Sequence, residues 1–142
     1  MLGTREVWEA LVVEVKRLDK FRDVRPYPFH KINDAAFLKD FPGLVFPACL
    51  VVRLGKTDTA KGQEMDRETR WSFVLICNDP DGSAWGDASD LEDAITDNIL
   101  DRQIMDGQIT IHGSNEAGIA LTNPRFAVHE ISATTRELGE RT

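Results

Sequence analysis

The sequence has few of the residues that build metal and catalytic centres, with only two cysteines and three histidines among 142 residues. His30, His112 and His129 match no common zinc spacing, and neither cysteine lies near one of them in the sequence. His112 and His129 fall in strands that we expect to be neighbours, so a metal site between them is kept as the minor alternative. We predict that the chain holds no metal and no cofactor.

Nucleophiles in an activating setting are also lacking. Cys49 and Cys77 lie within apolar runs, which predicts buried structural thiols. No serine lies in a Gly-x-Ser-x-Gly turn, and no glycine-rich loop that would cradle a phosphate occurs. The turn "NDPDGSAWGDAS" lacks the alternating ligands and distal glutamate of an EF-hand, although it carries Asp79, Asp81 and Asp87. The sequence therefore predicts a protein that is not an enzyme.

Long apolar stretches are absent as well. No window approaches the roughly 18 apolar residues that a membrane helix needs. The start, "MLGTREVWEALVVEV", meets charges within a few residues and has no unbroken apolar core of a signal peptide. We expect no membrane partner and a protein that stays in the cytoplasm, where both cysteines remain reduced.

Positive charge is scarce, and it is unevenly placed. The net charge of -7 argues against nucleic-acid recognition, which needs a basic face. Residues 1–78 carry 13 Lys and Arg against 11 Asp and Glu, whereas residues 79–142 carry 4 against 13. Such a division fits a chain whose two halves face different partners or a neighbouring copy of the same chain. A solvated acidic surface is the plainer alternative.

What the sequence does contain is the composition of one globular domain over residues 1–142, with 42% hydrophobic and 29% charged residues. Apolar residues recur at helical spacing from Arg5 to Lys20, which predicts an amphipathic helix. Asn33 favours a short helical turn after it. A second amphipathic helix is expected from about Ser89, with its buried stripe at Leu91, Ala94, Ile95, Ile99 and Leu100 and with Ile104 as a further candidate at its end.

Strands are predicted where β-branched and aromatic residues gather. Pro26 and Pro28 confine "RDVRPYPFHKI" to an extended segment at an edge or on the surface. Ala48–Leu54 does not alternate, which indicates a strand with both faces covered, and Trp71–Asn78 resembles it. Later strands are expected at 107–113, 118–123 and 125–135, the last with a bulge, and residues 135–142 are expected to be a frayed tail.

A charged arm, residues 55–70, separates the two central strands. Antiparallel pairing about Gly62–Gln63 would make facing residue numbers add up to about 126, which places Cys49 opposite Cys77 and Val52 opposite Val74. The arm is too long for an ordinary hairpin turn, so it is either the outer end of a ribbon or a flexible segment. The whole predicts an α+β domain: a mostly antiparallel mixed sheet of about four to five strands, packed by two main helices.

The order of these elements resembles that of the tail-terminator proteins of long-tailed bacteriophages and of related minor tail proteins. The resemblance spans about residues 5–134 and includes the "FPACLVV" strand entry, the charged arm, "RWSFVLI" and the "DLEDAITDNIL" helix. It implies a homo-hexameric ring that seats on the end of the tail tube, stops its polymerisation and presents a surface for the head. It further implies contacts with the tail-tube and head–tail connector proteins, in the host cytoplasm during assembly and at the head-proximal end of the virion tail.

A ring requires one face of a subunit to fit a different face of the next. On charge alone, cations of the arm are candidates to meet an acidic helix on a neighbour. The candidate interface residues are Lys56, Lys61, Arg67, Arg70, Asp90, Asp93 and Asp97.

Two other interpretations stay open. The chain could be another head–tail connector or neck ring protein of similar size. Alternatively it could be a small cytoplasmic enzyme or ligand-binding domain with a pocket on the sheet, assembled from residues far apart in the sequence.

Overall fold

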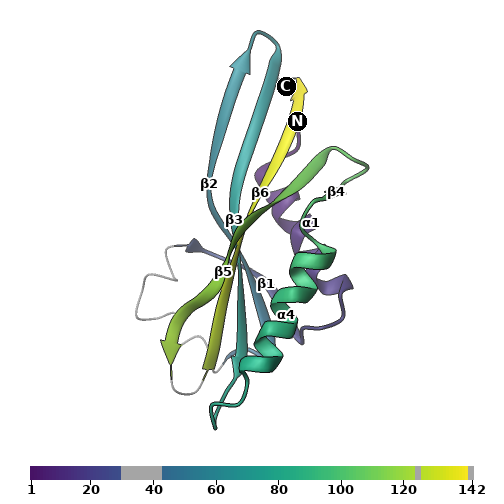
Figure 1. Ribbon diagram of the computed structural model, residues 1–142. Helices are drawn as coiled ribbons and strands as arrows, with labels where there is room; N and C mark the ends of the chain where they lie inside the picture. The colour runs from purple at the N-terminus through teal and green to yellow at the C-terminus, as the bar shows by residue number, and fades with distance from the viewer. Residues whose placement is uncertain (30–42, 124–125, 141–142) are drawn as a thin grey trace.

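The computed structural model describes residues 1–29, 43–123 and 126–140, and for 114–123 the backbone alone. It shows an α+β domain in which two helices cover one face of a twisted six-stranded mixed sheet (Figure 1). The elements are α1 (Thr4–Arg17), β1 (Asp23–Tyr27), β2 (Ala48–Lys61), β3 (Glu64–Asn78), α4 (Trp85–Asn98), β4 (Arg102–Ile104), β5 (Ile109–Asn123) and β6 (Phe126–Glu140).

The sheet has the order β1-β2-β3-β6-β5-β4, and only β1 and β2 run parallel. It has more strands than the four to five expected because short strands, β1 and β4, form its two edges. The α+β class, the mixed sheet and the two helices are confirmed. The expected strands at 107–113 and 118–123 are one bent strand, β5, whose pairing with β6 shifts between Gly113 and Ala117 and again between Ile119 and Leu121.

The C-terminal part of the chain is strand where a frayed tail was predicted. β3 and β6 pair without a break from Glu64 opposite Glu140 to Asn78 opposite Phe126. The prediction of fraying was therefore wrong for residues 135–140, which pair with the outer half of β3. The expected bulge in this strand was also wrong. Its alternation is broken because the inner half of β6 is covered on both faces.

The charged arm is the outer end of a β2–β3 hairpin, which was one of the two predicted alternatives. The predicted register was wrong by two residues in the inner half, where Cys49 lies opposite Leu75. A bulge at Leu54 then places one extra residue in β2, so that Gly55 pairs with Arg70. The shift by two keeps every inner side chain on its expected face, because side chains alternate with a period of two.

Helix α1 is joined to β2, beside the edge strand, by a side-chain hydrogen bond. The indole of Trp8 donates to the carbonyl oxygen of Val51, at 2.7 Å. Pro26 of β1 lies opposite Val51 and has no N–H to donate to the sheet. The expected edge segment is confirmed for Asp23–Tyr27, and its last residues, 30–32, lie outside the described residues. Helix α1 ends at Arg17, three residues earlier than predicted.

Helix α4 begins four residues before the predicted Ser89 and ends at Asn98. Its first turns bury Ala84 and Ala88, whose small side chains add little to an apolar pattern. Ile104 is buried in β4, not in the helix.

Two clusters of buried residues flank the inner half of the sheet. The larger lies under the helices and contains Trp71, Phe73 and Ile95, all fully buried. The smaller lies on the other face and joins Leu44 to Leu50 and Val74. The helical turn expected after Asn33 lies outside the described residues, and within them no helix is long and apolar enough to cross a membrane.

Candidate subunit interface

The most unusual part of the molecule is a ribbon that extends beyond the helices (Figure 1). It consists of Leu54–Lys61 of β2, Glu64–Arg70 of β3 and Thr134–Glu140 of β6. Every residue from Lys56 to Lys61 is exposed. At a strand rise of about 3.3 Å per residue, the β2 portion alone is roughly 26 Å long.

One edge of this ribbon is open. β1 pairs with β2 only from Ala48 to Val52, so from Leu54 to Lys61 no described strand pairs with the edge of β2 that faces away from β3. An edge of unpaired N–H and C=O groups is a template for another chain, and charged side chains commonly restrict what can join it. The alternating charges of Lys56, Asp58 and Lys61 place such a restriction here.

The ribbon has its own ion pairs on both faces. On the helix side, Arg67 donates to both carboxylate oxygens of Asp58, at 2.8 and 3.3 Å, and Lys56 lies 3.5 Å from the same carboxylate. On the other side, Arg136 makes a two-pronged pair with Asp66, at 2.7 and 3.0 Å. The hydrogen bond from each arginine is the main cause that lowers the pKa of its aspartate.

The N-terminus is fastened to the helix-side face of the ribbon. The backbone N–H of Leu2 donates to Glu137 at 2.8 Å, and Arg67 donates to the carbonyl oxygen of Leu2 at 3.1 Å. Glu137 is buried, and the N–H of Leu2 gives its carboxyl group a hydrogen-bond partner. Arg67 is therefore used within the subunit, by Asp58 and by the N-terminus.

The other two cations predicted for the interface have no ion pair with a described residue. Arg70 is exposed and its guanidinium crosses over Gly55, where an added Cβ would lie 2.9 Å from Nη2. Lys61 lines a shallow groove of about 540 Å³ at the ribbon tip, beside Leu138, whose side chain is 67% exposed. These two cations and this leucine are exposed ribbon groups that could meet a partner.

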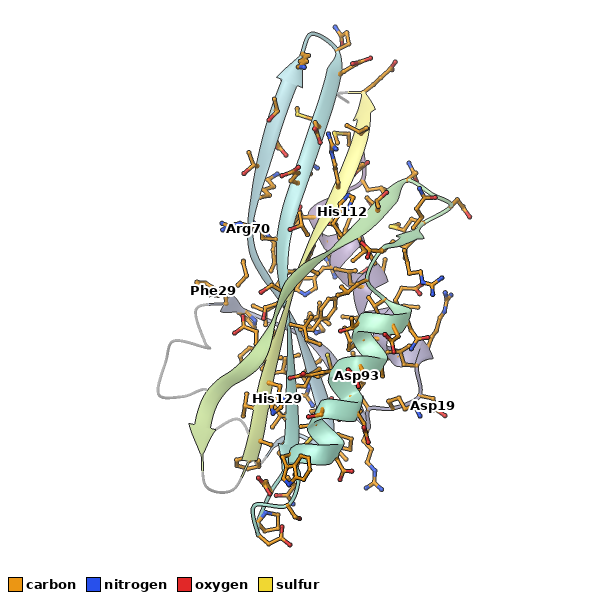
Figure 2. The ribbon with its side chains drawn as sticks, viewed as in Figure 1. Asp19, Phe29, Arg70, Asp93, His112 and His129 are labelled. Atoms are coloured by element: carbon orange, nitrogen blue, oxygen red, sulfur yellow. The ribbon has the colours of Figure 1, made fainter. Side chains whose placement is uncertain are left out.

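The acidic residues predicted for the interface lie on the exposed side of α4. Asp90, Asp93 and Asp97 are exposed, and none has a charged partner among the described residues. Figure 2 shows Asp93 on α4 and Arg70 on the far side of the ribbon. Within one subunit the structure does not bring the predicted cations and acids together, so a contact between them would need two subunits.

Residues with catalytic chemistry do not converge. His129 of β6 contacts Glu92 of α4, while His112 of β5 lies opposite Thr134, farther along the same strand (Figure 2). The described residues hold no cluster of ligands fit for a metal ion. Burial raises the pKa of the Cys49 thiol, and it raises that of Cys77 to about 11. Both cysteines are therefore protonated at neutral pH, unlike nucleophilic thiols.

Three groups were not among the predicted interface residues. Trp85, at the start of α4, is 73% exposed, and Leu138 is exposed on the ribbon. Arg53, in the strand expected at Ala48–Leu54, has a buried Nε without a hydrogen-bond partner among the described residues. An arginine inside the apolar run "LVVRLG" was the available signal.

Comparison with known proteins adds no relative: no protein-family model matches the chain, and no curated protein sequence matches it.

Proposed function

We propose that the chain is a structural protein of a bacteriophage tail, a terminator that forms a six-membered ring on the tail tube. The observation that carries the proposal is the ribbon. Ordering a backbone residue opposes folding by about 1–2 kcal/mol, and the β2 part of the ribbon, which is exposed from Lys56 to Lys61, returns little of this by burying apolar surface. We therefore expect the ribbon to serve in contacts with other molecules and not in stabilising the subunit itself.

The open edge of β2 and the uneven charge support assembly into a ring. A ring subunit presents two different surfaces to its neighbours. The arm offers Lys61 and Arg70, and α4 offers unpaired carboxylates on another part of the subunit. The scattered histidines and protonated thiols favour a structural role over an enzyme. The tail-tube and connector proteins are the proposed partners, in the host cytoplasm and then in the virion.

The test measures the mass of the purified protein by light scattering over a concentration series, with and without tail-tube particles. We expect a species about six times the 15.9 kDa of one chain, either alone or on tube ends. Electron microscopy of the same samples should show rings at one end of each tube. A protein that stays a monomer or dimer at every concentration and does not bind the tubes would overturn the proposal. Rings found on the connector but not on the tubes would assign the chain to the neck.

A shortened arm tests whether the ribbon is responsible. Removing Asp58–Lys61 and Glu64–Arg67 leaves Gly62–Gln63 as the turn and keeps Thr57 opposite Glu68. We expect the variant to fold, with cooperative unfolding, and to lose the six-fold species. The control is Thr57→Ser, a conservative substitution at an exposed position in the part of the arm that the shortened variant keeps. This control variant should assemble normally. Normal assembly of the shortened variant would refute the role of the ribbon.

A further inference from the structure

We propose that a groove beside α1 receives the acidic face of α4 from a second copy of the chain. This deepens the proposed function and rests on it, because it names the contact through which ring subunits meet. The groove has a volume of about 600 Å³. It is lined by Thr4, Arg5, Trp8 and Glu9 of α1, by Pro26, Tyr27 and Pro28 around the end of β1, and by Arg53 of β2.

Arg53 identifies the chemistry of the ligand. Its Nε is buried, and no described group accepts a hydrogen bond from it or pairs with its charge. A guanidinium has only donors and stays protonated, so a buried unpaired N–H is a persistent penalty for the isolated subunit. Because this N–H is closed to solvent, another molecule would meet the terminal nitrogens of the guanidinium, whose charge no described group balances. A carboxylate suits it best, because its two oxygens match the planar fork of the guanidinium.

The surroundings of Arg53 favour an anion. Glu9 is the only acid among the described residues that line the groove, and Arg5 already pairs with it at 3.1 Å. The groove also adjoins the first turn of α1, where the helix dipole is positive. Trp8, Tyr27 and the two prolines supply apolar walls, which strengthen a charge pair by excluding water.

The acidic face of α4 is the occupant that fits. Asp90, Asp93 and Asp97 follow one another at spacings of three and four residues, which places them along one exposed face of the helix. Three neighbouring carboxylates repel one another, so a guanidinium from a second copy would stabilise them. No other described helix carries three exposed acids without charged partners.

The groove and the acidic face also lie on different halves of the subunit. α1 packs on β1 and β2, whereas α4 packs on β3 and β6. Contact between them is therefore head to tail, with each subunit using its groove on one neighbour and its α4 on the other. Such contacts form a ring when the rotation between subunits closes. By contrast, two of the arm cations, Lys56 and Arg67, already have Asp58 as a partner.

The experiment compares self-association of Arg53 variants by sedimentation equilibrium, with and without tail-tube particles. Arg53→Met removes the charge and the unpaired N–H, so the thermal midpoint of the subunit should stay the same or rise. Its self-association should weaken about thirty-fold or more, the usual effect of removing one member of a buried charge pair. Arg17→Glu is the control, since Arg17 lies at the other end of α1 and pairs with Glu14. It should associate as the natural chain does.

A charge exchange identifies the partner helix. Arg53→Glu should abolish association, and adding Asp90→Arg, Asp93→Arg or Asp97→Arg, one at a time, should restore it about ten-fold or more in at least one pair.

The outcomes separate this inference from the proposed function. If every Arg53 variant forms the six-fold species as well as the natural chain does, the groove inference is overturned and the proposed ring stands. An Arg53-dependent dimer would support the groove contact and overturn the ring. A protein that stays monomeric with and without tubes would overturn both, as would a monomer whose groove binds a free dicarboxylate.

Discussion

Trp71 shows how a single side chain connects the core with the sheet. It is fully buried, packs edge-on against Trp8 with ring centres 5.9 Å apart, and donates to the hydroxyl of Thr135 at 2.8 Å. Thr135 is itself buried, so its hydroxyl depends on this indole.

We expect Trp71→Phe to lower the free energy of unfolding by about 2 kcal/mol, because the substitution leaves a buried hydroxyl without its partner. Adding Thr135→Val should recover part of the loss, since both polar groups are then gone. Urea denaturation measures both effects. Trp85→Phe, at a side chain that is 73% exposed, should change stability by less than about 0.5 kcal/mol. Equal losses at the two tryptophans would contradict this assignment.

The arm carboxylates give a pH dependence whose sign follows from the structure. Hydrogen bonds from Arg67 and Arg136 hold the pKa of Asp58 and of Asp66 below the ordinary 3.8. Their pairing therefore contributes fully above pH 3.8 and is lost as the pH falls through the lowered folded-state values. NMR titration of the carboxyl carbons should show both midpoints below 3.8. Arg67→Ala should return only the Asp58 midpoint towards its ordinary value, and Arg136→Ala only that of Asp66.

At the scale of elements, the turn of the arm depends on Gly62. Its φ is +63°, while Gln63 beside it has no positive φ, the pattern of a two-residue type II′ hairpin turn. We expect Gly62→Ala to destabilise the arm by about 1 kcal/mol, because an L side chain resists this conformation. Amide hydrogen exchange should speed up along Lys56–Glu68 and not in the inner strands. Gln63→Ala should leave exchange unchanged.

Helix α4 has one face for the core and another for solvent. Ile95 is fully buried beneath it, whereas Thr96 is exposed. Ile95→Ala should lower the free energy of unfolding by about 3 kcal/mol through the cavity it leaves. Thr96→Ala should change it by less than about 0.5 kcal/mol. Chemical denaturation compares the two, and similar losses would mean that α4 does not pack as described.

At the scale of the whole molecule, assembly through paired charges predicts a dependence on salt. The screening length falls from about 10 Å at 0.1 M ionic strength to about 3 Å at 1 M. Contacts between cations of one subunit and α4 of another should therefore form more slowly at high salt, while dissociation of buried pairs changes less. Stopped-flow light scattering of assembly at several salt concentrations measures both rates. Assembly that is indifferent to salt would point to an apolar interface, with Trp85 and Leu138 as its first candidates.

Local patterns predicted most of the elements. The helical spacing of Val7, Leu11 and Val15 indicated α1, and two apolar runs indicated the inner halves of β2 and β3. The start of α4 was missed because Ala84 and Ala88 carry almost no apolar signal. For the outer halves of β2 and β3 a ribbon and a flexible arm stayed open as alternatives, because the exposed residues from Lys56 to Lys61 show no alternation to detect. The outer half of β6 was missed because its buried positions, Thr135 and Glu137, are polar.

The candidate site was less accessible from the sequence. The cations of the arm were visible as charges, but their pairing with Asp58 and Asp66 depends on which residues the bulge at Leu54 places side by side. In the sequence, Arg53 is a single arginine within an apolar run, which does not indicate whether its side chain has a partner. Its lack of a partner follows from the residues of α1 and of the end of β1 that line the groove with it.

The sequence by itself determined the class of fold, the two helices, the central strands and the absence of known catalytic motifs, because these depend on periodicity and residue type within short windows. Only the tertiary structure decided the register of the hairpin, the strand character of the C-terminal residues and the groove around Arg53. These features depend on contacts between residues far apart in the chain. Glu137 accepts a hydrogen bond from Leu2, and Arg53 lines a groove with residues of α1 and β1. No local sequence pattern predicts contacts between residues so far apart in the chain.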